Sequence, residues 1–191
     1  MNLKPYKLSV LAVSLISPAA LIHTTAEVET MPAAASSPVA RMSAERGDCV
    51  SIDSTIAAIY DVISGEAGEE RDWDRMRSLF HPSARLISVS KNAEGEFTAR
   101  SLTPDEYIVN ASPFFAKEAF FERELSRKVE KFGHIAHVFS TYEAVQTPDG
   151  EPIDRGINSM QLFYDENRWW VMTIYWDRET EEHPLPEQYL E

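Results

Sequence analysis

The sequence has a single cysteine, Cys49, so an intrachain disulfide is excluded. A lone thiol in an exported protein is either buried or free to pair with another chain, and the residues around Cys49 carry no feature typical of a catalytic cysteine. The sequence also lacks a glycine-rich phosphate-binding loop and the paired nucleophile and base of acyl-transfer enzymes. The role of Cys49 stays open, and no short motif indicates a reaction.

Basic residues are few in this chain. It has 18 lysines and arginines against 31 aspartates and glutamates, which gives a formal net charge of −13. No block of basic residues offsets this charge, so we expect neither nucleic acid nor an anionic membrane surface as a partner. His134 and His137 are three residues apart and lie on opposite faces of a regular strand, so they cannot bind one ion together. We expect no metal site and no other cofactor.

Only the start of the chain has an extended apolar run. Lys4 and Lys7 precede the apolar residues 8–22, and small residues follow at 24–26. This order is typical of a signal peptide, so we predict that residues 1–26 direct export to the periplasm or the medium. The run is short and is interrupted by serines and a proline, which disfavours the alternative of an uncleaved membrane anchor. After cleavage we expect no contact with the membrane.

Composition divides the rest of the chain into three parts. Residues 27–47 are rich in alanine, serine and proline, which predicts a flexible leader. Residues 48–178 are long enough to form one domain with its own core. Residues 179–191 are charged and contain two prolines, which predicts a charged tail.

The domain ends with three β-rich runs that two short turns join. These runs predict an antiparallel meander of three strands at 134–145, 155–164 and 168–176. Helical spacing of apolar residues and capping residues predict three earlier helices at 51–64, 73–80 and 103–112. Further strands are expected at 84–90 and near 121–132, and 96–101 is expected to pair back on the first of these. The fold class is therefore α+β, with a bent antiparallel sheet packed against three helices in the N-terminal half.

Four short segments carry a resemblance to a known family. They are Ile59-Tyr60-Asp61, Asp72-Trp73-Asp74-Arg75, Leu79-Phe80-His81-Pro82 and Ala84-Arg85-Leu86. With the order of elements over residues 50–178, they resemble the nuclear transport factor 2-like superfamily, which includes polyketide cyclases, ketosteroid isomerase and scytalone dehydratase. The resemblance implies a cone-shaped fold. This fold hosts enzymes, binding proteins and dimerisation modules, so it does not by itself imply an activity.

The catalytic residues of these relatives can be compared with this chain one at a time. Tyr60 lies where ketosteroid isomerase has a pocket tyrosine. The position of that enzyme's general base falls near Ser88, and its protonated acid falls near Ser159 or Met160, so neither carboxylate is present.

Scytalone dehydratase has a Tyr-Asp pair just before a similar Asp-Trp-Asp-Arg run. Tyr60 and Asp61 form such a pair here, but residues 62–71 intervene. Asp61 lies about 100° round the helix from Tyr60, which favours a solvated position over a pocket base. Asp61 and Tyr60 remain the candidate catalytic residues.

Alternation along the strands predicts which side chains face the interior of the cone. It assigns Ser140 and Tyr142 to the interior on the first strand of the meander, and Asn158 on the second. On the last strand it assigns Trp170, Met172, Ile174 and Trp176. The predicted ligand pocket is mostly apolar and is lined by Tyr60, Trp73, Ser140, Tyr142, Asn158, Met172 and Trp176.

The opposite face of the sheet is also apolar. Its predicted residues are Ile135, Phe139, Ile157, Phe163, Val171 and Tyr175. Such a face is expected to be covered, and proteins with the cone-shaped fold often pair through it, so we expect a homodimer.

Three functions are compatible with the sequence. The first is an exported protein that binds a small, mostly apolar ligand inside the cone. The second is an enzyme of the dehydratase, isomerase or cyclase type that uses general acid–base residues in the cone. The third is a non-catalytic dimerisation module with a filled cone. The size of the cavity distinguishes the third from the others, and a buried carboxylate or histidine with a shifted pKa that points into the cavity distinguishes the second from the first.

Overall fold

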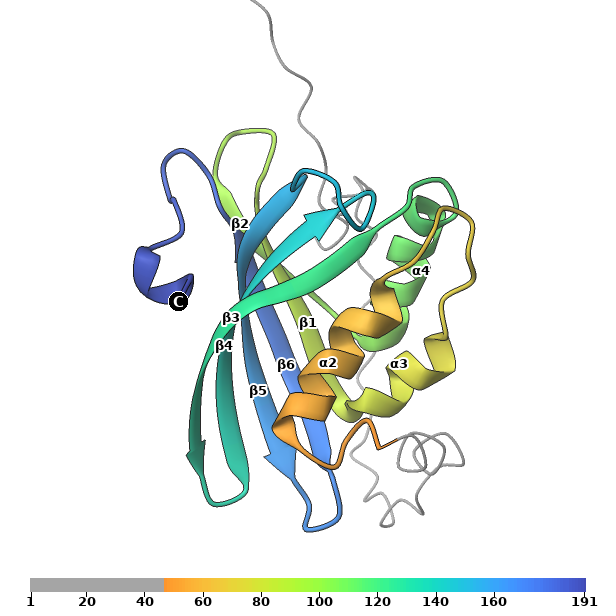
Figure 1. The fold of residues 1–191 in the computed structure, drawn as a ribbon, viewed down its shortest axis with the longest axis vertical. Coiled ribbons are helices and arrows are strands. Elements are labelled where there is room, and N and C mark those ends of the chain that lie inside the picture. Colours follow the sequence, from red (N-terminus) through yellow and green to blue (C-terminus); the bar gives the residue numbers. More distant parts are fainter. Residues whose placement is uncertain (1–46) are drawn as a thin grey trace, which may run out of the picture.

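The computed structural model describes residues 47–191 as three helices packed on one sheet (Figure 1). The predicted signal peptide and all of the predicted leader except its last residue lie outside the described residues. Within residues 47–191, no helix has the length and apolar character needed to cross a membrane. The helices are α2 (Ile52–Ile63), α3 (Trp73–Leu79) and α4 (Pro104–Phe115).

Six strands form the sheet, in the order β2-β1-β6-β5-β4-β3. They are β1 (Phe80–Lys91), β2 (Phe97–Leu102), β3 (Phe121–Phe132), β4 (Ile135–Val145), β5 (Asp154–Tyr164) and β6 (Trp169–Arg178). The sheet curves round the three helices, which all lie on one of its faces (Figure 1). The predicted α+β class, the three helices and the meander β4-β5-β6 are therefore confirmed.

One prediction about the sheet is wrong, because β1 and β6 pair in parallel. Phe80 pairs with Val171 and Ser88 pairs with Trp176, so both strands run in the same direction. The other neighbouring strands pair antiparallel, and β2 pairs back on β1 as expected. The sheet is thus mixed. Alternation predicts the faces of a strand but carries no information on the direction of its neighbour.

Capping residues determine where two of the helices begin. Ser51 and Ser54 form a capping box at the start of α2, and Thr103 and Glu106 form another at the start of α4. The predicted end of α4 is wrong, because the helix continues through Pro113 to Phe115. Proline at this position removes only its own N–H from the helix, and Ala116 still donates to the carbonyl of Ser112 at 3.0 Å.

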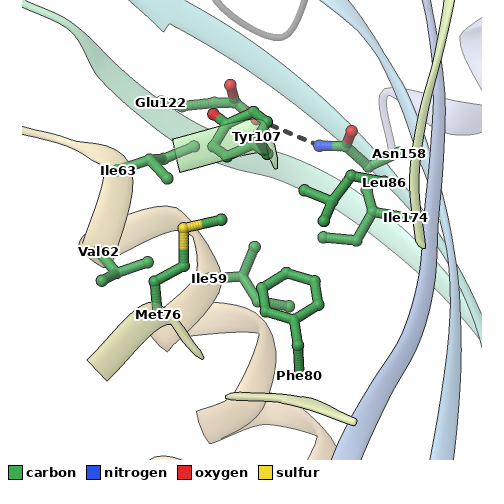
Figure 2. A pocket seen from close by; sticks show the side chains of 10 residues that line it. All are labelled: Ile59, Val62, Ile63, Met76, Phe80, Leu86, Tyr107, Glu122, Asn158 and Ile174. Atoms are coloured by element: carbon green, nitrogen blue, oxygen red, sulfur yellow. Dashed lines mark hydrogen bonds between the residues drawn. The ribbon is translucent and has the colours of Figure 1, made fainter. Parts of the chain in front are cut away.

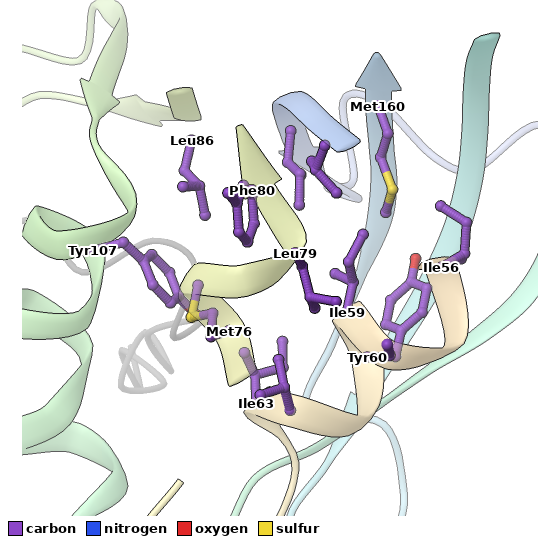
Figure 3. Close-up of a cluster of buried hydrophobic side chains, with 14 of the residues drawn as sticks. Ile56, Ile59, Tyr60, Ile63, Met76, Leu79, Phe80, Leu86, Tyr107 and Met160 are labelled. Atoms are coloured by element: carbon purple, nitrogen blue, oxygen red, sulfur yellow. The ribbon is translucent and has the colours of Figure 1, made fainter. Parts of the chain in front are cut away.

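The core lies between the helices and the concave face of the sheet (Figure 3). The predicted apolar stripe of α2 is buried there, and α3, β1 and β5 each add large side chains. Burial of one such side chain stabilises the fold by about 1.5–3 kcal/mol. The labelled members are Ile56, Ile59, Tyr60, Ile63, Met76, Leu79, Phe80, Leu86, Tyr107 and Met160.

A bulge in β6 reverses part of its predicted face assignment. Gln161 pairs with Thr173 and Leu162 pairs with Val171, so Met172 is left without a direct partner in β5. On the C-terminal side of the bulge, Ile174 and Trp176 are buried in the cone as predicted. On the N-terminal side, Trp169 and Val171 are buried, and the assignment of Trp170 and Met172 to the interior is wrong. One extra residue moves every preceding side chain to the other face.

The outer face of the sheet carries apolar side chains and the C-terminal tail. Ile135 and Tyr175 are exposed there, whereas Val171 belongs to the core. The tail turns back and forms the short helix η2 (Glu187–Tyr189) on the side of the sheet away from the helices (Figure 1). The ring of Tyr189 lies 5.0 Å from that of Phe139, and its carbonyl accepts a hydrogen bond from Thr141. The predicted tail therefore covers part of the face that we expected to pair.

Cys49 is buried where the described chain begins. Its sulfur accepts a hydrogen bond from the buried Arg168 at 2.6 Å, and its carbonyl accepts from the N–H of Trp169 at 2.9 Å. Burial raises the pKa of the Cys49 thiol, although Arg168 acts in the opposite direction. These contacts attach the segment before α2 to the start of β6, which is a structural role.

Candidate functional site

Four polar side chains meet inside the cone, and each comes from a different element. Tyr60 projects from the end of α2, Glu122 from β3, Ser140 from β4 and Asn158 from β5. The hydroxyl oxygens of Tyr60 and Ser140 are 2.7 Å apart. The Nδ2 atom of Asn158 donates to the Tyr60 hydroxyl and to Oε1 of Glu122, each at 3.2 Å. All four side chains are buried, so they form a polar cluster within an apolar core.

Ser140 links this cluster to charged residues at the edge of the sheet. Its hydroxyl donates to Oε1 of Glu124 at 2.5 Å. The other carboxylate oxygen of Glu124 lies 2.7 Å from the guanidinium of Arg127, which also contacts Asp53 at the start of α2 at 2.9 Å. The polar cluster is thus connected to the surface by side-chain hydrogen bonds and ion pairs.

Glu122 has the environment of a functional carboxyl group. Desolvation by burial raises its pKa to about 8, against an ordinary value of 4.5, and the hydrogen bond from Asn158 opposes this shift only in part. Glu122 is therefore mostly protonated at neutral pH. Its Oε2 atom is buried and has no hydrogen-bond partner among residues 47–191.

Two neighbours of Glu122 also have buried atoms that lack a partner in the described part of the chain. They are Oδ1 of Asn158 and the hydroxyl of Tyr107, which projects from α4. Burial is the main cause that raises the pKa of both Tyr60 and Tyr107, so both phenols stay neutral. Buried polar atoms are nearly always paired in native proteins, so a group of three unpaired atoms indicates a place for a polar molecule.

A small cavity lies against these groups (Figure 2). Its volume is about 20 Å³, which is room for about one water molecule. Glu122, Tyr107 and Asn158 lie together on one side of it, and apolar side chains of α2, α3, β1 and β6 lie on the others (Figure 2). Its lining is Ile59, Val62, Ile63, Met76, Phe80, Leu86, Tyr107, Glu122, Asn158 and Ile174.

The structure brings some of the predicted pocket residues together. Tyr60, Ser140 and Asn158 form the polar cluster, and Asn158 also lines the cavity. Tyr142 is fully buried, and its hydroxyl donates to Asp154 at 3.3 Å. Trp176 is buried on the concave face, outside the cavity lining.

Other predicted site residues lie elsewhere. Trp73 is half-buried on α3 and packs against Phe115, with ring centroids 5.8 Å apart. Met172 lies at the bulge of β6 and does not line the cavity. Asp61 points to solvent with a side chain that is 69% exposed, and it pairs with Arg75. Asp61 therefore does not reach the cone interior, whereas its neighbour Tyr60 does.

The sequence analysis missed Glu122, the most perturbed carboxyl group of the cone. Along β3 the apolar residues Phe121, Leu125 and Val129 alternate with charged residues, and no face of this strand was assigned to the interior. In the structure Glu122 pairs with Ala144 and Glu124 pairs with Tyr142, so both glutamates share the inner face. Because residues opposite each other on neighbouring strands share a face, the correct assignment of β4 would have revealed Glu122 once the register was known.

Histidine, cysteine and carboxylate side chains do not gather into a metal-binding group in the described part of the chain. Within residues 47–191, no three of them lie close enough to hold a metal ion. The arrangement around Glu122 instead offers neutral hydrogen-bonding groups. Such groups can bind a polar atom of a small molecule, and Glu122 can also transfer a proton near neutral pH.

Solved structures that match most of the described chain establish its fold. A nuclear transport factor 2-like protein of unknown function from Pseudomonas putida has 10% sequence identity, and the match covers 76% of this chain and 94% of that protein with a TM-score of 0.52. A Nostoc punctiforme protein with a cystatin-like fold also has 10% identity, over 69% of this chain and 96% of that protein, with a TM-score of 0.51. This chain has the nuclear transport factor 2-like fold.

The resemblance seen in the sequence is thus confirmed at the level of the fold. A Mycobacterium tuberculosis protein of unknown function shares this nuclear transport factor 2-like shape as well, with 12% identity over 78% of this chain, 80% of that protein and a TM-score of 0.52. No protein-family model matches the chain, and no curated protein is recognisably similar in sequence. Because one fold hosts many functions, the activity has to be argued from the residues of the cone.

Proposed function

We propose that this protein binds a small, neutral and mostly apolar molecule inside the cone, with its polar group hydrogen-bonded to protonated Glu122. The observation that carries the proposal is the buried and unpaired Oε2 atom of Glu122 beside the cavity. Apolar walls with a few placed polar groups are typical of ligand sites. Among residues 47–191 no cationic side chain lines the cavity, so an anionic head group would be buried there without a counter-charge.

The cavity must widen to admit such a molecule, since its volume of about 20 Å³ holds no more than a water molecule. Met76 is the wall residue best suited to move. It has three rotatable bonds and no branch, and methionine adapts readily to irregular spaces. Met76 lies on the short helix α3, which has only seven residues. A change in its side chain opens space next to Glu122 without breaking a strand pairing.

A specific observation also favours an enzyme as the second candidate. A carboxyl group with a pKa of about 8 both donates and accepts protons at physiological pH, as a general acid–base catalyst must. The predicted candidate Asp61 is replaced in this role by Glu122. The simplest probe is cyclohexanone in D₂O, because general acid–base catalysis exchanges its α-hydrogens for deuterium. Exchange above the buffer rate that disappears in Glu122→Gln would support the enzyme, and exchange at the buffer rate would count against it.

The small cavity itself favours the third candidate, a filled cone that serves only for pairing. The three unpaired atoms around Glu122 are the reason to prefer ligand binding, since a filled core gains nothing from burying them. We also propose that the protein is exported and forms a homodimer through the outer face of the sheet. The apolar residues of that face support the dimer, although η2 covers the part of it around Phe139.

Binding can be tested by NMR with two neutral probes, 2-piperidone and cyclohexanone, added to the purified protein. The methyl groups of Ile59, Ile63 and Ile174 line the cavity and report on entry, whereas Ile135 is 58% exposed on the outer face and serves as a control. We expect saturable shifts of the three cavity methyl groups with at least one probe at pH 6.5. The anion cyclohexanecarboxylate should give none.

A variant separates binding at Glu122 from unspecific entry into the core. Glu122→Leu removes the polar group and should abolish the saturable shifts, while Glu122→Gln keeps a neutral donor and should retain them. The proposal is wrong if neither probe shifts the cavity methyl groups, or if Glu122→Leu binds as well as the original protein.

A further inference from the structure

In each hydrogen bond of the polar cluster, one can determine which group is the donor and which is the acceptor. The assignment starts from Glu124 at the edge of the sheet. Glu124 is paired with Arg127 at 2.7 Å, and an ionised carboxylate can only accept hydrogen bonds. The contact between Ser140 and Glu124 therefore requires the Ser140 hydroxyl to be the donor. The single proton of that hydroxyl is used in this contact.

The donor role of Ser140 determines the donors and acceptors of the next two hydrogen bonds, toward the centre of the cone. Because Ser140 has no further proton, its oxygen accepts from the Tyr60 hydroxyl at 2.7 Å. Tyr60 has then used its own proton, so its oxygen accepts from Nδ2 of Asn158 at 3.2 Å. The orientation of the Asn158 amide is thereby fixed, with its nitrogen toward Tyr60.

The orientation of the Asn158 amide determines which oxygen of Glu122 carries the proton. Its Nδ2 atom also donates to Oε1 of Glu122, so Oε1 is an acceptor and the proton of the neutral carboxyl group belongs on Oε2. At this end of the series of hydrogen bonds, Oε2 of Glu122 is left as a donor and Oδ1 of Asn158 as an acceptor. Neither has a partner among residues 47–191, and the same holds for the nearby Tyr107 hydroxyl. The two atoms Oε2 and Oδ1 belong to side chains that lie next to each other against the cavity (Figure 2).

From this donor and acceptor pair we infer that the cone selects ligands whose polar group both accepts and donates a hydrogen bond, such as a lactam, a primary or secondary amide or an alcohol. The inference rests on the proposed function and specifies its ligand class. A ketone or an ether pairs with Glu122 but leaves Oδ1 of Asn158 buried and unpaired. An unpaired buried acceptor weakens binding by about tenfold or more.

Ser140 and Glu124 act in this scheme as positioning residues, since neither lines the cavity. They determine which end of the Asn158 amide faces the ligand. Removing the Ser140 hydroxyl leaves the Tyr60 proton free to turn toward Asn158, and the amide is then free to reverse. Reversal exchanges the positions of the donor and the acceptor, so a lactam can then bind with its N–H and C=O groups turned the other way, even though the cavity walls stay the same.

The matched pair of 2-piperidone and cyclohexanone tests the inference, because the two rings have similar size and only the lactam has a donor. We expect 2-piperidone to bind at least about tenfold more tightly in the NMR titration described above. In Ser140→Ala the lactam should still bind more tightly, but its shifts of the methyl groups of Ile59, Ile63 and Ile174 should follow a different pattern, because the lactam is no longer held in one orientation. Ser78→Ala makes the same change at a buried serine of α3 outside the polar cluster, and it should leave both the ratio and the pattern unchanged.

The outcomes separate the inference from the proposed function. Equal binding of both probes to the original protein would overturn the inferred polarity and leave ligand binding standing. A pattern of methyl shifts in Ser140→Ala identical to that of the original protein would overturn the positioning role of Ser140. Binding of neither probe would overturn both the inference and the proposed function.

Discussion

At the scale of single residues, the cone combines two kinds of buried polar group. Tyr60 and Ser140 are buried, and their hydroxyl groups are paired by hydrogen bonds. Their burial therefore costs little free energy. Glu122 is buried with one oxygen unpaired, which is costly unless the group is neutral or has a ligand. The contrast explains why the pKa of Glu122 is raised and why we place the ligand at this residue.

The raised pKa of Glu122 predicts how stability depends on pH. Below about pH 4.5 the carboxyl group is protonated in both the folded and the unfolded chain. Between about 4.5 and 8 the unfolded chain loses the proton and the folded chain keeps it, so the free energy of unfolding falls as the pH rises. Above the folded pKa the loss is complete, and it is on the order of 5 kcal/mol.

This prediction is measured by urea denaturation between pH 5 and pH 9. Glu122→Gln carries no titrating group, so its gain in stability over the original protein should grow with pH up to about 8. Glu151→Gln is a suitable control, because Glu151 is exposed in the loop between β4 and β5, and it should show no such trend. A constant difference between Glu122→Gln and the original protein would contradict the prediction.

At the scale of the elements, the sequence predicted the helices and the meander because capping residues, turns and apolar spacing are local signals. The capping residues Thr103 and Glu106 predict the start of α4. Pro148 and Gly150 predict the turn that residues 147–150 form between β4 and β5. The parallel pairing of β1 with β6 and the bulge at Met172 could not be predicted in this way. Both depend on contacts between distant parts of the chain.

The difference between local signals and contacts of distant segments also explains which residues of the site were predicted. Tyr60, Ser140 and Asn158 lie on elements with clear periodicity, so their inward orientation followed from the sequence. Glu122 lies on a strand with many charged residues, and only its pairing with Ala144 shows that it faces inward. Met172 was placed in the pocket because a regular strand was assumed.

The bulge in β6 leads to a prediction about neighbouring core residues. Ile174 is 3% exposed and lines the cavity, so Ile174→Ala should lower the free energy of unfolding by about 2–5 kcal/mol. Met172 lies at the bulge and is only partly buried, so Met172→Ala should have an effect of less than about 1.5 kcal/mol. Chemical denaturation measures both, and an equal loss would show that Met172 faces the core.

At the scale of the whole molecule, the two faces of the sheet have different coverings. Helices α2, α3 and α4 lie on the concave face (Figure 1), and the tail with η2 contacts Phe139 and Thr141 of β4 on the other. Ile135 and Tyr175 remain exposed on that outer face. Exposed apolar residues gathered on one face are typical of an interface between chains.

The proposed homodimer predicts the effect of a charge on the outer face. Tyr175 is 44% exposed at the centre of the sheet, so Tyr175→Glu should weaken the dimer by about tenfold or more, as measured by sedimentation equilibrium. Val109 is 72% exposed on α4, on the other side of the sheet, and Val109→Glu is a matched control that should not change the association. A protein that is monomeric before either change would refute pairing through this face.

Ligand binding at Glu122 is tested by an NMR titration of its carboxyl carbon, with and without saturating 2-piperidone. Glu122→Gln identifies the signal in protein labelled at its glutamate carboxyl groups. We predict a pKa of about 8 without the probe, and a higher pKa with it, because the ligand accepts a hydrogen bond only from the protonated form. A pKa close to 4.5, or one that 2-piperidone leaves unchanged, would contradict the account.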